Sequence, residues 1–341
     1  MQDFTIAYGN YDKTPGNYYL PAGSPLKAAI YLALKLGKPL LITGEPGTGK
    51  TQLAYWAAWF LANQVDDNLQ RFVPEPFVFH TKTTSASKDL FYHYDAISHF
   101  QDKEGKKDIS QFIGLAAMGQ AIGQTLGKSA LQANYALNGL KNVDALHPAP
   151  CSSVLLIDEI DKAPRDFTND LLDEIENNRF YITEMDKTIY RSDDRRSRIL
   201  VILTSNNENT LPDAFLRRCL FYNVPFPSDD ELMKIIINRI SPFLQEVIRV
   251  SDVDFTSRYV KALQLFRLVQ NRAIVKRPST SELLDWIKVL HLEGLLDGHV
   301  DITNLAGLDE AQKRSLLISL YTLIKTRQDL EQIEMLLNST Q

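Results

Sequence analysis

The chain has 341 residues, and at about 150 residues per domain this length predicts two domains. Its composition, 44% hydrophobic and 23% charged, is typical of a folded globular protein and excludes a mainly disordered chain. With 37 basic and 42 acidic residues, the net charge of −5 excludes attraction of nucleic acid or an anionic membrane by the protein as a whole, although not by a local basic groove.

Cysteine usage and hydropathy indicate the compartment. Two cysteines, Cys151 and Cys219, are too few for a disulfide framework or a Cys-based zinc site, so we expect reduced thiols. The first ten residues carry an acid and no apolar run, which does not fit a signal peptide. Because no apolar stretch is long enough to cross a bilayer, we expect a cytoplasmic protein.

Short apolar runs separated by helical patterns predict an α/β fold. A helix is expected to begin at Ser24-Pro25, a capping residue followed by proline, and to end at Gly37. A second helix is expected from Thr51 to about Asn63. The runs typical of buried strands are Pro39–Thr43, Phe77–His80, Ser153–Ile157, Ile199–Leu203 and Leu220–Val224. Their alternation with helical patterns predicts a parallel sheet flanked by helices.

The sequence changes character after Pro227. Ser228 and Glu231 form a capping box that opens an amphipathic helix, and the pattern is helical from there to Gln341. We therefore predict an α/β core over residues 1–227 and an all-helical lid domain over residues 228–341.

The middle of the chain predicts a different kind of structure. Tyr92–Phe100 and Ile109–Gly114 flank a polar turn and are typical of a β-hairpin. Residues 114–150 then carry glycines at helical spacing, which indicates close helix packing or flexibility. The Gly-Lys-Ser at 127–129 lacks the spacing and the preceding strand of a phosphate-binding loop.

Residues 44–51 read GEPGTGKT and match G-x-x-x-x-G-K-[ST] in full. In such a loop the glycines let backbone N–H groups surround phosphate oxygens, and the following helix adds its positive N-terminal end. Lys50 is expected to reach the β- and γ-phosphates of a nucleotide, and the Thr51 hydroxyl to bind Mg²⁺. The alternative, a chance glycine-rich turn, is weakened by the apolar strand before the loop and the helix after it.

A second strand, Val154–Ile157, is followed by two acids, Asp158 and Glu159. At the carboxyl end of a parallel strand, Asp158 can face a Mg²⁺ held by the loop, and Glu159 can polarise a water that attacks the γ-phosphate. A strand that runs into an acidic helix cap is the alternative, and the preceding loop disfavours it.

Four further residues are candidates for the same site because of their order after these motifs. Asn206 follows the strand Ile199–Leu203 and can bond the γ-phosphate and the attacking water. Arg217 and Arg218 end a short helix; such a pair can be a solvated helix end or an arginine finger for a neighbouring subunit. Arg277 precedes a capping box at Ser279, where it could reach a nucleotide.

Together these segments resemble the AAA+ ATPase superfamily. GEPGTGKT, LLIDEID, ILTSNN, LPDAFLRRC and KRPSTSELLDW follow the order Walker A, Walker B, sensor 1, arginine finger, sensor 2. DEIDKAPRDFTNDLL and TSNNENTLPDAFLRRC look most like the MoxR-like (AAA_5-type) branch. The resemblance covers roughly residues 24–330. It implies two β-hairpin inserts, which the segments Tyr92–Gly114 and Arg179–Arg198 fit.

The resemblance also implies roles for individual residues. Glu159 and Lys50 act in hydrolysis, Asn206 is sensor 1, Arg277 is sensor 2, and Arg218, with Arg217 in reserve, is the finger. Thr51 and Asp158 would bind Mg²⁺. The residues implied to bind ATP or ADP are Gly44, Glu45, Pro46, Gly47, Thr48, Gly49, Lys50, Thr51, Gln52, Asp158 and Arg277.

Two classes of function remain after this comparison. The first is a ring, expected to be a hexamer, that remodels or activates protein partners; MoxR-type proteins typically work with von Willebrand factor A-type proteins. The second is a nucleic-acid translocase or loader, for which Lys103, Lys106 and Lys107 could contact phosphates. Neighbouring acids balance these lysines, and no DNA-binding module is recognisable. A small-molecule kinase is disfavoured by sensor 1, the arginine pair and the helical domain.

Overall fold

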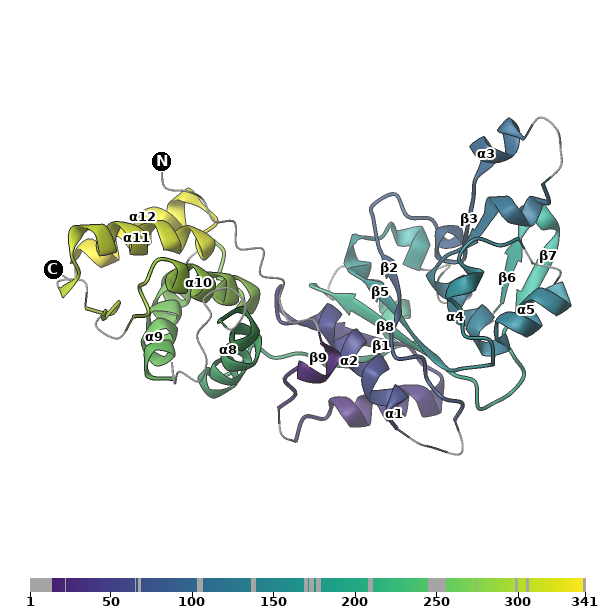
Figure 1. Ribbon diagram of the computed structural model, residues 1–341, viewed down its shortest axis with the longest axis horizontal. Helices are drawn as coiled ribbons and strands as arrows, with labels where there is room; N and C mark the ends of the chain where they lie inside the picture. The colour runs from purple at the N-terminus through teal and green to yellow at the C-terminus, as the bar shows by residue number, and fades with distance from the viewer. Residues whose placement is uncertain are drawn as a thin grey trace. The chain divides into compact units, whose positions relative to one another are not determined.

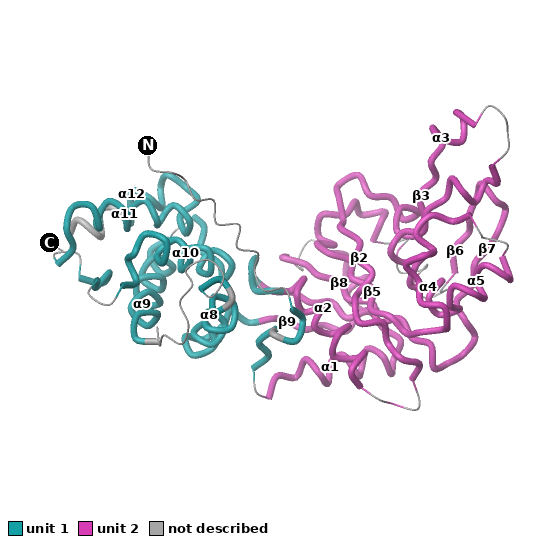
Figure 2. The backbone as a smooth tube through the Cα atoms, viewed as in Figure 1, with its two compact units in different colours: residues 1–21, 45–49, 225–341 teal, residues 22–44, 50–224 magenta. Residues whose placement is uncertain are grey.

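The computed structural model describes most of the chain in two compact units. The described residues are 14–21, 23–64, 66, 69–102, 107–135, 139–168, 171, 175, 179–207, 211–244, 256–273, 275–297, 300–304 and 307–339. Residues 22–44 and 50–224 make an α/β unit, and residues 1–21, 45–49 and 225–341 make a helical unit (Figure 2). The units divide between Val224 and Pro225, and the loop tip 45–49, inside the predicted core, belongs to the helical unit.

A five-stranded sheet in the order β2-β5-β8-β1-β9 forms the centre of the α/β unit (Figure 1). All four neighbouring pairs are parallel. The strands are β1 (Leu40–Thr43), β2 (Phe77–His80), β5 (Ser153–Asp158), β8 (Ile199–Ser205) and β9 (Leu220–Asn223). The predicted α/β class and the five predicted strands are confirmed. Because the strands are parallel, their carboxyl ends share one edge of the sheet.

Helices cover this sheet and make its middle strands inaccessible to water. The helices that contact it are α1 (Leu26–Leu36), α2 (Lys50–Ala62) and α4 (Ala117–Leu126). The unit also contains α5 (Lys128–Tyr135), which packs on α4, and the short α7 (Asp213–Leu216). Helix α1 packs on β1, β8 and β9, whereas α2 and α4 pack on β5 and β8. All residues of β1 and β5 are buried, as expected for strands covered on both faces. Helix α1 ends, as predicted, at Gly37 in a left-handed conformation.

The predicted hairpin at 92–114 is wrong over most of its length. Only β3 (Tyr92–Tyr94) and β4 (Ile113–Leu115) pair as antiparallel strands. Residues Ala96–Gln101 form helix α3 instead, because the Asp95 side chain accepts a hydrogen bond from the Ser98 N–H at 3.0 Å and caps it. Figure 1 shows α3 standing away from the rest of the α/β unit. Lys103 and Lys106 lie outside the described residues.

A second antiparallel pair precedes β8. Strands β6 (Arg179–Ile182) and β7 (Lys187–Tyr190) pair over four positions, in the segment where the resemblance implies a hairpin. The loop that follows β7 leads into β8.

The glycine-rich segment after β4 packs closely, one of the two alternatives that its spacing indicates. A Cβ on Gly119 of α4 would lie 2.0 Å from the carbonyl oxygen of Phe91, and a Cβ on Gly123 would lie 3.2 Å from Leu131 and Leu146. Only glycine lets α4 approach the backbone before β3 so closely.

The helical unit has a core of its own. Its helices are α8 (Asp229–Phe243), α9 (Thr256–Arg272), α10 (Thr280–Leu292), α11 (Glu310–Ser319) and α12 (Arg327–Ser339). Trp286 of α10 is fully buried, and its indole N–H donates to the Ser319 hydroxyl at 2.9 Å. Ser228 and Glu231 form the predicted capping box of α8. Among the described helices, none is both long and apolar enough to traverse a bilayer.

Candidate nucleotide site

Three neighbouring strands end together at the carboxyl edge of the sheet. Strand β8 lies between β5 and β1, with Ile157 opposite Leu203 and Thr43 opposite Ser205. Gly44, which directly follows β1, the acids that end and follow β5, and the polar residues that end and follow β8 therefore meet at one edge. Polar ligands of open α/β sheets bind at such edges.

Asp158 joins the first two motifs directly. The Thr51 hydroxyl, in the first turn of α2, lies 3.0 Å and 3.2 Å from the two carboxylate oxygens of Asp158. Asp158 is only 8% exposed, so these hydrogen bonds offset part of the cost of burying its charge. Thr51 and Asp158, the two predicted Mg²⁺ ligands, thus contact each other within the α/β unit.

Thr204, which was not among the predicted site residues, holds both acids of the second motif. Its hydroxyl donates to Asp158 Oδ1 at 2.6 Å and accepts a hydrogen bond from the Glu159 N–H at 2.9 Å. Thr204 is 1% exposed. Ile157 of β5 lies opposite Leu203 of β8. The next residue of each strand in this parallel register is Asp158 and Thr204, so these two lie side by side. Only a sequence argument that aligned β5 with β8 could have found it.

Glu159 has a left-handed backbone. Its φ is +57°, in a region where non-glycine residues are uncommon and which costs of order 1 kcal/mol or more. Its carboxylate is ion-paired with Lys162, and this pairing raises the pKa of the Lys162 ammonium. The Glu159 side chain is 42% exposed. Its carboxylate can therefore exchange this partner for a water at the sheet edge.

Lys50 and Asn206 flank the Asp158 cluster. The Lys50 side chain is buried, and its ammonium donates to the Gly44 carbonyl at 2.8 Å, which folds the side chain back along the loop. Asn206 directly follows β8, and its N–H donates to Asp161 Oδ1 at 3.2 Å. That bond fixes the backbone of Asn206 at the edge where the predicted sensor must lie. His80, also missed from sequence, ends β2 with Nδ1 3.5 Å from Asp158 Oδ2.

The loop tip at 45–49 and Arg277 belong to the helical unit. Gly47 and Gly49 have φ of +76° and +85°, which only glycine adopts readily. A Cβ on Gly47 would lie 2.7–2.8 Å from Ser279 and Ser281 at the start of α10. Arg277, two residues before Ser279, is exposed. The helical unit thus brings the loop tip close to the segment that carries Arg277.

Arg217 and Arg218 lie toward the opposite edge of the sheet. Both are exposed, after the α7 helix that buried Phe215 anchors. They precede Leu220, which is paired with Leu40 at the start of β1, whereas the glycine-rich loop that begins at Gly44 follows the end of β1. The four paired residues of β1 and β9 alone span about 10 Å. The structure therefore does not bring this pair together with Lys50, Thr51 and Asp158 of the same chain.

The donor set fits Mg²⁺. A threonine hydroxyl and a single carboxylate are hard oxygen ligands, and Mg²⁺ on nucleotides uses one or two carboxylates with phosphate oxygens and waters. In the part of the chain that the structure describes, no group of three or more His, Cys, Asp or Glu residues could hold a metal. A bound Mg²⁺ would therefore depend on nucleotide oxygens as well as on Thr51 and Asp158.

Comparison with known proteins identifies the family. A comparison with curated proteins gave no match. Among solved structures, the crystal structure of the FIGL-1 AAA domain in complex with ADP is similar at 15% sequence identity and a TM-score of 0.40, over 92% of this chain and 86% of that chain. The family model described as AAA domain (dynein-related subfamily) matches residues 39–219, more than half of the chain. The chain therefore belongs to the dynein-related subfamily of AAA domains, and it is an ATPase of that family.

Proposed function

We propose that this ATPase is a MoxR-like, ring-forming machine, most simply a hexamer, that uses Mg·ATP to remodel or activate partner proteins. The observation that carries the nucleotide chemistry is the Thr51–Asp158–Thr204 cluster, which joins the ends of β5 and β8 to the start of α2. In this proposal Lys50 binds the β- and γ-phosphates, Thr51 and Asp158 hold Mg²⁺, Glu159 polarises the attacking water, and Asn206 orients it.

The placement of the arginine pair supports a ring. Because Arg217 and Arg218 lie toward the amino edge of the sheet, they are poorly placed to neutralise charge on the γ-phosphate at the carboxyl edge of their own subunit. A second subunit that presents its arginines to this carboxyl edge would complete the site. The proposal therefore assigns Arg218, with Arg217 in reserve, to a neighbour's nucleotide.

A protein partner is favoured by the surface of α3. Ile97 and Phe100, one helical turn apart, are 73% and 90% exposed. Apolar side chains on a projecting helix suit contact with a polypeptide, such as a von Willebrand factor A-type protein, better than contact with a phosphate backbone.

Lys50→Ala and Glu159→Gln should separate binding from hydrolysis. Loss of the Lys50 charge should abolish ATP binding, whereas Glu159→Gln keeps the shape of the side chain but cannot take up a proton. We expect the Gln variant to bind ATP and to hydrolyse it at least about 10²-fold more slowly. Equilibrium binding of a fluorescent ATP analogue and phosphate release measure the two steps. Hydrolysis by Glu159→Gln at the parental rate would show that another residue is the base.

Thr204→Val should disable hydrolysis through the two acids that Thr204 holds. Valine has nearly the same shape but leaves the Glu159 N–H without its acceptor and leaves Asp158 with the Thr51 hydroxyl but without the Thr204 hydroxyl as a donor. We expect kcat to fall about 10- to 100-fold, as for other residues that orient metal ligands, and unfolding free energy to fall by about 1–3 kcal/mol. Thr204→Ser, which keeps the hydroxyl, is the control and should stay near parental. An equal loss of kcat in Thr204→Val and Thr204→Ser would show that the Thr204 hydroxyl does not position the two acids.

Arg218→Ala should be rescued in trans. Alone it should lose about 10³–10⁵-fold in hydrolysis, the range known for arginine fingers, while light scattering with Mg·ATP still shows assembly. Mixing it with Lys50→Ala subunits should restore activity, because some interfaces then combine an intact loop with an intact arginine.

As a control for this mixing experiment, Arg217→Ala subunits are mixed with Lys50→Ala subunits in the same way. If the mixture with Arg218→Ala hydrolyses no ATP although mixed rings are shown to form, Arg218 is not the finger. Arg217 would then be the finger, or Arg218 would be a structural residue. A monomer at every protein concentration and nucleotide state would eliminate the ring.

The partner class can be tested with the Glu159→Gln variant, which should retain ATP and its partner. We expect proteins that co-purify with it to be released by ADP and to be depleted when Ile97 and Phe100 are both changed to Ser. Leu32→Ser, an equally polar change at a half-exposed position of α1, is the matched control. Co-purification that depends on nucleic acid, together with ATPase stimulation by DNA, would instead support a translocase or loader.

A further inference from the structure

A basic pocket lies at the amino edge of the central sheet, away from the nucleotide site. It has a volume of about 210 Å³ and is bounded by the end of α1, the starts of β1 and β8, and the loop before β8. Its walls combine three cationic side chains with apolar ones. The cationic lining residues are Lys38, Arg191 and Arg198, and the apolar ones include Leu34, Ile175 and Val201. The phosphate-binding loop follows β1 at its other end, so this pocket is a separate site.

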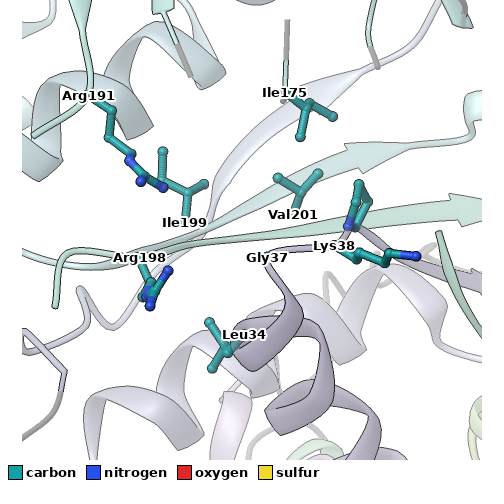
Figure 3. A pocket seen from close by; sticks show the side chains of 9 residues that line it. Leu34, Gly37, Lys38, Ile175, Arg191, Arg198, Ile199 and Val201 are labelled. Atoms are coloured by element: carbon teal, nitrogen blue, oxygen red, sulfur yellow. The ribbon is translucent and has the colours of Figure 1, made fainter. Parts of the chain in front are cut away.

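The charges of the pocket are unbalanced. Figure 3 shows Arg191 and Arg198 on one side of the pocket and Lys38 on the other. No carboxylate is among the lining residues that the structure describes. Within the described chain, neither arginine side chain makes an ion pair, whereas Arg196 of the same loop binds Asp194 at 2.9 Å.

Both arginines extend from backbone that the α/β unit holds in place. The Arg198 N–H donates to the Ser152 hydroxyl at 3.0 Å, and its carbonyl accepts from the Ser153 N–H at 2.9 Å. Next to Arg191, the Ser192 N–H donates to the buried Thr125 hydroxyl at 3.0 Å. A ligand would therefore meet two guanidinium groups whose attachment points are already ordered, which lowers the entropy cost of binding.

The electrostatic environment of Arg191 favours an anion. Burial lowers the pKa of the Arg191 guanidinium, and the nearby charge of Arg198 lowers it further, while Asp193 acts in the opposite direction. Two like charges in a partly buried pocket repel each other, and an anion bound between them would offset this repulsion.

We propose that this pocket is a binding site for a phosphate group, held by Arg191 and Arg198 and assisted by Lys38. Guanidinium groups bind phosphate oxygens in a bidentate way, and two or three cations suit a doubly charged phosphate better than a single carboxylate. The apolar walls at Leu34, Ile175 and Val201 can accommodate a hydrophobic group on the same ligand. The site thus fits either free phosphate or the phosphate of a small organic ester.

The test uses the full chain with the Lys50→Ala change, so that the phosphate-binding loop cannot contribute. Inorganic phosphate and phenyl phosphate are titrated in separate calorimetric experiments, at fixed ionic strength. We expect both to bind, and Arg191→Gln or Arg198→Gln to weaken binding about tenfold or more, the scale of a charge-assisted hydrogen bond. Arg195→Gln removes the same charge from the same loop but does not line the pocket, so it should bind as the parent does.

The two probes distinguish the sources of phosphate. Tighter binding of phenyl phosphate assigns the site to an organic phosphate, and equal binding assigns it to the free anion. Arg191→Lys, which keeps the charge, should bind better than Arg191→Gln, and thermal unfolding checks that each variant is folded. Absence of binding by both probes overturns the proposal. Binding that survives the Arg191→Gln, Arg198→Gln double change, or that falls equally in Arg195→Gln, also overturns it.

Discussion

A single buried carboxylate, that of Asp158, joins the parts of the nucleotide site in the α/β unit. Thr51 from α2 and Thr204 from β8 donate to it, and His80 from β2 lies 3.5 Å away. A buried charge is tolerated only when hydrogen-bond donors surround it. Thr51, Thr204 and His80 come from separate segments of the chain, so they converge on Asp158 only if β2, β5 and β8 are neighbours in register. The strand order and the site chemistry therefore depend on each other.

The parallel sheet also separates the two places at which we propose phosphate binding. Its carboxyl edge presents a lysine, hydroxyls and carboxylates, which suit a metal-bound nucleotide. Its amino edge presents Arg191 and Arg198 in the pocket, and the Arg217–Arg218 pair lies before β9. Guanidinium groups at that edge cannot neutralise Asp158 or compete with its hydroxyl donors. This separation leaves the arginines available for anions that come from outside the subunit.

The sequence predicted the residues of the α/β site that form contiguous motifs, because a glycine-rich loop and a strand ending in acids have direct local consequences. Thr204 escaped prediction because its role comes from the register between β5 and β8, which only the fold defines. The hairpin at 92–114 was predicted with strands that were too long, since the apolar alternation there did not reveal the Asp95 cap. The pocket at Arg191 and Arg198 was not foreseen either, because its walls come from segments far apart in the chain.

The length of β8 determines how the two edges of the sheet can influence each other. Arg198 directly precedes β8 and Asn206 directly follows it, so eight residue steps, or about 25 Å of extended chain, separate the pocket from the predicted sensor. At about 25 Å, two unit charges in a medium with an effective dielectric constant of about 20 interact by less than about 1 kcal/mol, so the two sites interact only weakly through their charges. Any coupling between them must instead be mechanical. Strand β8 is buried along nearly its whole length and hydrogen-bonded to β5 and β1 on its two sides. A displacement at Arg198 would therefore reach Thr204 only if β5 and β1 moved together with β8. A movement of Thr204 would in turn displace the backbone of Glu159, which is hydrogen-bonded to it.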